Sequence, residues 1–271
     1  MKKDLSYLYK LPIIFIIGYS FYSFYIFLSN KKTLNINYFE INREIVENYT
    51  KAIKKNPNNH ILYLGRGKAK YEYGDYLGAI NDYENSLILK FDIKTLLQKA
   101  DAKYEFGDYS GAIIDYKNSL KLNKGNTYYK IANSKFIIFD YEAAINNYNK
   151  SIKINPKNYY AFLYRGNAKY RLKIYKESID DYNRAIEIND KDFITFNNRG
   201  VSKFKLKRYE SAIKDFNKAL IINKGNYNSL YNRSITYYNL KQYKKACIDL
   251  KKSIKLGKEV FKEEYLKICI K

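Results

Sequence analysis

The stretch YRGNAKYRLKIYKESIDDYNRAI, residues 164–186, decides the fold because its pattern returns along most of the chain. A small residue, Gly166, is followed by Tyr175, Ser178, Tyr182 and Ala185. This pattern predicts two packed helices joined by a turn, because small residues let helix backbones approach to about 8–10 Å. Five further segments align with it: GRGKAKYEYGDYLGAINDYENSL (65–87), QKADAKYEFGDYSGAIIDYKNSL (98–120), KIANSKFIIFDYEAAINNYNKSI (130–152), NRGVSKFKLKRYESAIKDFNKAL (198–220) and NRSITYYNLKQYKKACIDLKKSI (232–254).

The first small residue of each copy marks a regular period, with spacings of 33, 32, 34, 34 and 34 positions. These residues are Gly67, Ala100, Ala132, Gly166, Gly200 and Ser234. A half-copy, NYTKAIKKNP, precedes the first full copy at residues 48–57. Since each unit buries one face on its neighbour, the pattern predicts a quasi-one-dimensional array whose ends must be capped.

The motif resembles the tetratricopeptide repeat, a helix–turn–helix unit of about 34 residues. The resemblance covers residues 45–258 and implies an all-α, right-handed α-solenoid of six repeats, with no cofactor. Helix-ending proline is kept only at Pro57 and Pro156. The predicted organisation is a membrane segment at 1–32, a half-repeat at 36–58, full repeats at 60–92, 93–124, 125–158, 159–192, 193–226 and 227–257, and a capping helix at 258–271.

Residues 11–28 (LPIIFIIGYSFYSFYIFL) contain no charge, and lysines flank them on both sides. A helix from Pro12 to Leu28 spans about 25 Å, slightly less than a bilayer core. A cleaved signal peptide and a buried core helix are alternatives, but the cleavage site is poor and the flanking lysines disfavour burial. The pattern favours an uncleaved, single-pass membrane anchor. The lysine distribution slightly favours an extracytoplasmic repeat domain.

A covariation inside the repeats predicts ion pairs between the two helices. The copy with Ile131 in place of a cation also has Asn147 in place of a carboxylate. The neighbouring helix-A lysines do not vary with the aspartate in this way. The predicted structural pairs are Arg66–Asp82, Lys99–Asp115, Arg165–Asp181, Arg199–Asp215 and Arg233–Asp249.

The family resemblance implies a groove lined by the first helix of each repeat, where segments of partner proteins bind. Stacked aromatics at such positions also serve packing, so both roles stay open. The acidic Asp101 disfavours a clamp for a peptide carboxylate, which other family members build there. The candidate groove residues are Tyr71, Tyr104, Phe136, Tyr170, Phe204, Tyr238, Asn133, Asn167, Arg171 and Lys205.

The composition disfavours an enzyme. The 271 residues contain one histidine and two cysteines, too few for a His-rich metal centre or a four-thiolate zinc site. His60 lies in an inter-repeat loop, and GKAK (67–70) lacks the spacing of a phosphate-binding loop. No catalytic or metal-binding residue is predicted. Whether Cys247 and Cys269 pair is left open.

Fifty Lys and Arg against 27 Asp and Glu give a net charge of +23. An excess of positive charge can come from a basic composition of the whole source proteome or from selection for basic residues in this protein. Residues 159–271 alone carry +14, so the excess is not spread evenly. That asymmetry favours an acidic partner. Two functions follow. The first is a membrane-tethered scaffold that binds protein or peptide segments in the groove. The alternative is polyanion binding, to nucleic acid or an anionic surface, through the basic C-terminal half.

Overall fold

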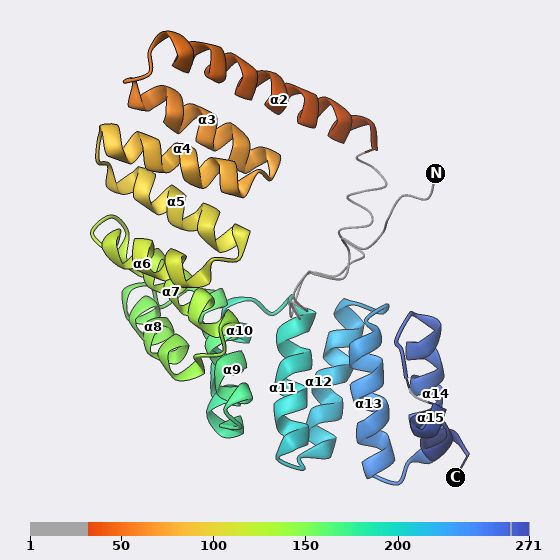
Figure 1. Ribbon diagram of the computed structural model, residues 1–271. Helices are drawn as coiled ribbons and strands as arrows, with labels where there is room; N and C mark the ends of the chain where they lie inside the picture. The colour runs from red at the N-terminus through yellow and green to blue at the C-terminus, as the bar shows by residue number, and fades with distance from the viewer. Residues whose placement is uncertain (1–31, 261, 271) are drawn as a thin grey trace. The chain divides into compact units, whose positions relative to one another are not determined.

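The computed structural model describes residues 32–260 and 262–270, and helices with no strand make up this part of the chain (Figure 1). The chain divides into two compact units, Met1–Glu40 and Ile41–Lys271. The helices are α2 (Lys32–Lys55), α3 (His60–Tyr73), α4 (Tyr76–Leu89), α5 (Ile93–Phe106), α6 (Tyr109–Asn118), α7 (Lys124–Ile137), α8 (Tyr141–Ile154), α9 (Tyr159–Arg171), α10 (Tyr175–Ile188), α11 (Phe193–Lys205), α12 (Tyr209–Ile222), α13 (Tyr227–Asn239), α14 (Tyr243–Lys255) and α15 (Lys262–Cys269).

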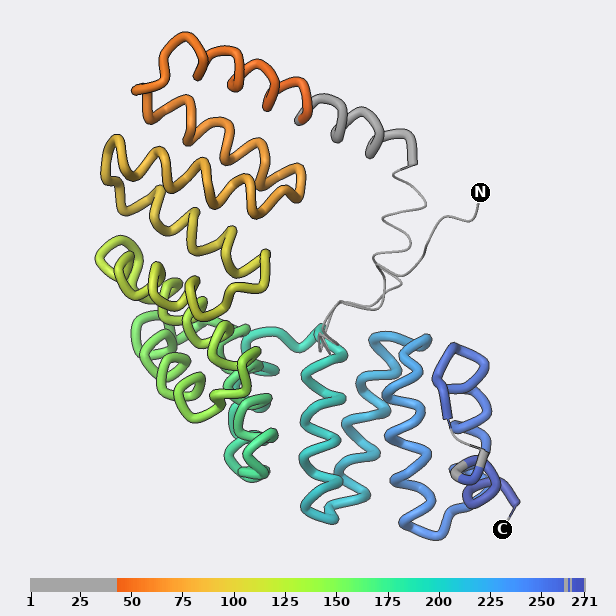
Figure 2. The backbone as a smooth tube through the Cα atoms, in the orientation of Figure 1, coloured from red at the N-terminus to blue at the C-terminus, as the bar shows by residue number. Residues whose placement is uncertain are grey.

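The larger unit is a helical solenoid in which each helix from α3 onward packs on the next along the chain (Figure 2). The odd-numbered helices α3 to α13 are the first helices of the repeats, called helix A here, and the even-numbered helices α4 to α14 are helix B. Successive A helices also contact one another at α7–α9, α9–α11 and α11–α13. The A helices therefore share one face of the array, called the helix-A face below.

The small residue of helix A is the point of close approach inside each repeat. A Cβ atom at Gly166 would lie 2.7 Å from the Tyr182 ring, and one at Gly200 would lie 2.7 Å from the Phe216 ring. Both rings are almost completely buried. The periodic small and aromatic positions therefore form the core, as expected for helices packed at short distance.

A left-handed residue ends each A helix and starts the turn to helix B. This position is Gly74 and Gly107 in the first two repeats, with φ of 89° and 96°. In the later repeats it is Phe139, Lys173, Lys207 and Lys241, with φ between 59° and 64°. The next backbone N–H donates to the carbonyl five residues earlier, as in a Schellman motif. The same turn therefore forms in all six repeats whatever the side chain.

The capping helix α15 is tied to the last repeat by a disulfide. Cys247 of α14 and Cys269 of α15 are bonded, with Cα atoms 4.9 Å apart. Ile268 is 2% exposed and packs with Ala246 and Leu250 of α14. The structure thus decides a pairing that the sequence left open.

The single-pass membrane anchor predicted at residues 1–32 is corrected. No helix in the described part of the chain is long and apolar enough to cross a bilayer, so the predicted membrane localisation is not supported. The apolar stretch on which the prediction rested, residues 11–28, lies outside the described residues.

Candidate peptide-binding groove

The six aromatic residues predicted to line the groove lie in one row along the helix-A face. Each is half-buried and packs against the tyrosine that begins helix B of the same repeat, with ring centroids 5.4 or 5.5 Å apart. Edge-on or tilted aromatic pairs at this distance are favourable. Each ring is therefore used partly for packing and keeps part of its surface exposed, although Lys267 also lies over the Tyr238 ring, 5.8 Å from its centroid. The pairs are Tyr71–Tyr76, Tyr104–Tyr109, Phe136–Tyr141, Tyr170–Tyr175, Phe204–Tyr209 and Tyr238–Tyr243.

Asn133 and Asn167, two predicted polar groove residues, accept hydrogen bonds from buried tyrosines of their own repeats. The Tyr148 hydroxyl donates to Asn133 Oδ1 at 2.7 Å, and the Tyr182 hydroxyl donates to Asn167 Oδ1 at 2.8 Å. Asn167 is 2% exposed, and its amide nitrogen has no hydrogen-bond partner. Both asparagines therefore position core tyrosines. Asn133 also lines a cavity on the helix-A face, whereas Asn167, predicted as a groove residue, is buried and does not face the groove.

The sequence carries a signal for these hydrogen bonds that was missed. Repeats whose helix-B aromatic is tyrosine have an acceptor at the matching helix-A position, as in Tyr116 with Asp101 at 2.7 Å. The two last repeats have Phe216 and Leu250 instead, and Val201 and Ile235 stand at the matching positions. The first repeat, with Tyr83 and Lys68, departs from the rule.

The two predicted cationic groove residues are both exposed. The Arg171 guanidinium lies over the ring of Tyr141 in the preceding repeat, 5.4 Å from its centroid. Lys205 occupies the corresponding position one repeat later, at the end of α11. Both charges are therefore accessible beside the aromatic row.

A cavity of about 250 Å³ opens on the helix-A face among α3, α5 and α7. Its lining includes Asp101 and Glu105 of α5 and Lys130 of α7. The Lys130 Nζ lies 2.6 Å from Asp101 Oδ1 and 2.7 Å from Oδ2. Four tyrosines complete much of the wall: Tyr71, Tyr104, Tyr116 and Tyr129. Sequence reasoning named two of these rings separately, but the enclosure they form depends on three successive repeats.

The structure brings together the five cation–aspartate pairs that the covariation pointed to. In the arginine copies the Nε and Nη2 atoms donate to the two carboxylate oxygens at 2.5 to 3.0 Å. Lys99 Nζ lies 3.6 Å from Asp115 Oδ2. Each aspartate is at most 5% exposed, so these are buried ion pairs.

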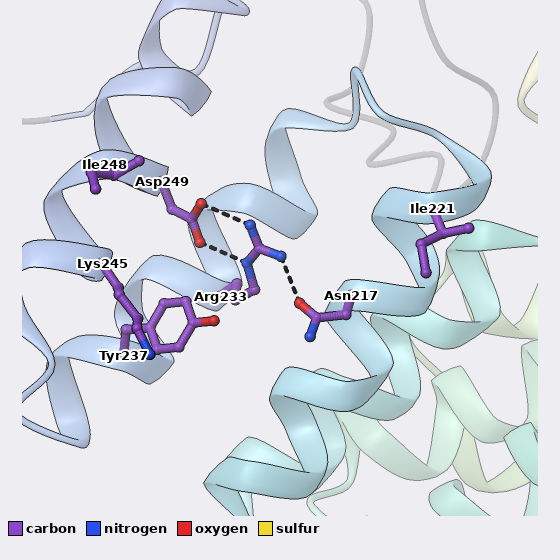
Figure 3. A pocket seen from close by; sticks show the side chains of 7 residues that line it. All are labelled: Asn217, Ile221, Arg233, Tyr237, Lys245, Ile248 and Asp249. Carbon is purple, nitrogen blue, oxygen red and sulfur yellow. Dashed lines mark hydrogen bonds and ion pairs between the residues drawn. The ribbon is translucent and has the colours of Figure 1, made fainter.

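Two kinds of further partner were missed, each present in four of the five pairs. The helix-A lysine one turn later also reaches the carboxylate, as Lys169 does to Asp181 at 2.8 Å. In addition, the arginine donates through Nη1 to helix B of the preceding repeat. Figure 3 shows Arg233 between Asp249 and Asn217. Its Nη1 atom donates to Asn217 Oδ1 at 2.6 Å. The equivalent acceptors are Thr50, Asn149 and Asn183.

The third repeat lacks both the cation and the aspartate of the buried pair, and its neighbours explain why. Lys117 occupies the position of those asparagines, and it would repel an arginine in the next helix. Ile131 stands there instead and is 1% exposed. Lys135, lacking an aspartate at position 147, pairs with Asp140 at 2.7 Å. The covariation therefore extends between repeats as well as within them.

The charge asymmetry of the chain lies mainly in the turns between helices A and B, not in the groove. The turn dipeptides are Gly-Asp, Gly-Asp and Phe-Asp in the first three repeats. They are Lys173-Ile174, Lys207-Arg208 and Lys241-Gln242 in the last three, and these residues are exposed. The early aspartates cap helix B by accepting a backbone N–H, whereas the late turns make no side-chain cap bond. We call residues 173, 207, 208 and 241 the basic turn edge.

No group of three or more His, Cys, Asp and Glu residues in the described part of the chain could hold a metal ion. His60, which sequence analysis placed in a loop, is the first residue of α3.

Comparison with known proteins agrees with this geometry. Tetratricopeptide repeat models match residues 193–226 and 227–257, and a TPR repeat model matches residues 140–173. The chain therefore contains tetratricopeptide repeats, arranged in an all-α solenoid. No protein with curated annotation matches the chain.

Several solved structures share the fold. A crystal structure of MamA protein is 24% identical, covers 61% of this chain and 92% of its own, and has a TM-score of 0.57. The C-terminal part of a TPR repeat-containing protein from Cytophaga hutchinsonii is 18% identical, covers 85% and 96%, and has a TM-score of 0.70. MamA from residue 41 onward of Desulfovibrio magneticus RS-1 is 16% identical, covers 60% and 94%, and has a TM-score of 0.58.

Proposed function

We propose that the chain is a non-enzymatic interaction scaffold that binds an extended peptide segment of a partner protein along the helix-A face. The aromatic row carries this proposal. Six half-buried rings repeat along one face, each packed in its own repeat and each keeping part of its surface exposed. Aromatic rings give large contact area at low entropic cost, and they dominate peptide-binding surfaces.

The partner segment carries acidic residues in this proposal. Arg171 and Lys205 are exposed beside the aromatic row, and the basic turn edge adds four exposed cations in the last three repeats. None of those four makes an ion pair within the described residues, so their charge is not used internally. Complementary charge raises the association rate of an acidic segment with these repeats.

A peptide-display selection against the full chain tests this function. Selected peptides are expected to be enriched in Asp and Glu, and Tyr170→Ala is expected to weaken their binding at least about tenfold, the loss of one interface aromatic. The Lys205→Glu variant is also expected to weaken binding of the selected peptides, and it does not alter the core because Lys205 is exposed. Lys218→Glu, an equally exposed lysine on helix B, serves as the matched control. Selected peptides that bind all three variants equally would contradict groove binding.

Polyanion binding is the second candidate, and the basic turn edge is the observation that favours it. Binding of heparin, used as the probe, would fall steeply with salt because condensed counterions are released. Reversing Lys207 and Arg208 to Glu is expected to abolish that binding while leaving groove peptides with uncharged sequences bound. Heparin binding that survives the double reversal would contradict this second function.

A further inference from the structure

The cavity among α3, α5 and α7 combines aromatic walls with carboxylates. Tyr71 and Tyr104 contribute rings from two successive A helices, while Asp101 and Glu105 lie one helical turn apart on α5. Aromatic faces attract cations because the ring quadrupole is negative there. The lining therefore has the chemistry of a site for a positively charged group.

An ammonium group of the chain itself is already held in this cavity. Lys130 Nζ contacts both Asp101 oxygens, at 2.6 and 2.7 Å, and lies 5.7 Å from the centroid of the Tyr116 ring. The Tyr116 hydroxyl donates to the same carboxylate at 2.7 Å. Lys130 therefore already pairs with the Asp101 carboxylate and the Tyr116 ring.

The second carboxylate, that of Glu105, has no such partner. Within the described residues it makes no hydrogen bond and no ion pair with a cation. Glu105 is exposed to solvent, yet desolvation by its surroundings and then the Asp101 carboxylate raise its pKa, so no cation of the described chain compensates its charge. Burial, followed by the carboxylates of Glu105 and Asp101, likewise raises the pKa of Tyr71. Negative potential therefore persists in the cavity after Lys130 is counted.

We propose that this cavity binds the ammonium group of a lysine side chain of the partner peptide, with Glu105 as counter-ion and Tyr71 and Tyr104 as walls. This inference rests on the proposed function in one respect, namely that the lysine belongs to the partner peptide. An acidic side chain would meet Asp101 and Glu105 directly, and an apolar one would bury a carboxylate without a partner. The volume of about 250 Å³ suits one long side chain rather than a folded segment.

Small probes test the cavity without a known peptide. N-acetyl-lysine methylamide and its neutral analogue, N-acetyl-norleucine methylamide, are titrated into the full chain and followed by saturation-transfer NMR. The lysine probe is expected to bind at least about threefold tighter, the combined effect of a cation–π contact and an exposed ion pair. Glu105→Gln is expected to remove this difference. Glu210→Gln, the same change at an exposed position of α12, leaves it unchanged.

The outcomes separate this inference from the groove function. Equal binding of the two probes, or a preference that survives in Glu105→Gln, would overturn the lysine site while leaving peptide selection unaffected. Tighter binding of N-acetyl-arginine methylamide than of the lysine probe would overturn the choice of lysine. A lysine preference that depends on Glu105 supports the site, even if display selection finds no groove peptide.

Discussion

At the residue scale, the buried aspartates hold together groups from three helices. Asp181 is 2% exposed and is contacted by Arg165 and Lys169, while Arg165 also bonds Asn149 of the preceding repeat. Removing a carboxylate from such a cluster leaves two cations with little compensation. The aspartate therefore links helix A to helix B, and its arginine links one repeat to the next.

Asp181→Asn is expected to lower the free energy of unfolding by about 3 kcal/mol, the lower end for breaking a buried pair because both cations keep some exposure. Urea denaturation measures it. The matched control is Glu187→Gln, which removes an ion pair to Arg184 whose side chains are 63% and 59% exposed. That change is expected to cost less than about 1 kcal/mol. Equal costs for the two variants would contradict the structural role.

The left-handed turn position makes a second residue-scale prediction. No atom lies within 4 Å of a Cβ built on Gly107, so Gly107→Ala meets only backbone strain and is expected to cost about 1 kcal/mol. Lys173→Gly relieves the same strain and is expected to stabilise by about 0.5 kcal/mol. Lys218→Gly, in the middle of α12, should instead destabilise by about 1 kcal/mol. Denaturant midpoints of the three variants compare these signs directly, and destabilisation by Lys173→Gly would refute the strain argument.

At the scale of one element, the disulfide determines how firmly α15 caps the array. The bond closes a loop with a sequence separation of 22, which in the chain-entropy account stabilises by about 3 kcal/mol. Helix α15 is short and has Ile268 as its one fully buried side chain among those described. Without the bond, packing of that residue is a weak restraint.

Reduction is therefore expected to release α15 before the rest of the array unfolds. Hydrogen exchange with and without dithiothreitol measures it, and faster exchange should be confined to α15 and the end of α14. The Cys247→Ser/Cys269→Ser variant provides the control, since its exchange should not respond to reductant. Equal protection of α15 in the oxidised and reduced chains would show that packing alone holds the cap.

At the scale of the whole molecule, the net charge of +23 opposes compactness through self-repulsion. Salt screens this repulsion between exposed charges, while buried pairs such as Arg199–Asp215 are screened much less. Raising NaCl from about 0.05 M to about 0.5 M is therefore expected to raise the melting temperature. Circular dichroism at 222 nm, the wavelength of helical signal, follows the melt. A melting temperature that falls with salt would mean that exposed ion pairs outweigh repulsion.

Much of the array could be predicted from the chain itself. A period near 34 with small and aromatic residues at fixed places determines where helices pack closely, because only glycine, alanine or serine fits beside a buried ring. The cation–aspartate pairs were visible for a related reason: Ile131 and Asn147 change together, since neither charge is tolerated alone in a buried position. The sequence also favoured a membrane anchor, which the described helices do not support.

Other features depended on neighbours that sequence spacing does not reveal. Lys169 joins the Asp181 cluster although lysine at that position does not vary with the aspartate, because the next turn of helix A faces the same carboxylate. The sequence showed that the C-terminal half carries most of the excess charge, and the structure places much of that charge on the basic turn edge. The net charge of a segment does not show which surface carries its charged side chains; that depends on where the fold places the turns.

The sequence by itself determined the repeat, its period, the small and aromatic core positions and the paired charges, because each is a local or within-repeat requirement. Only the tertiary structure decided which cysteines bond, how arginines connect successive repeats, and that Tyr71, Tyr104, Glu105 and Lys130 line one cavity. Those arrangements join residues from different repeats, or from the last repeat and the capping helix, and their distances follow from how each unit stacks on the next.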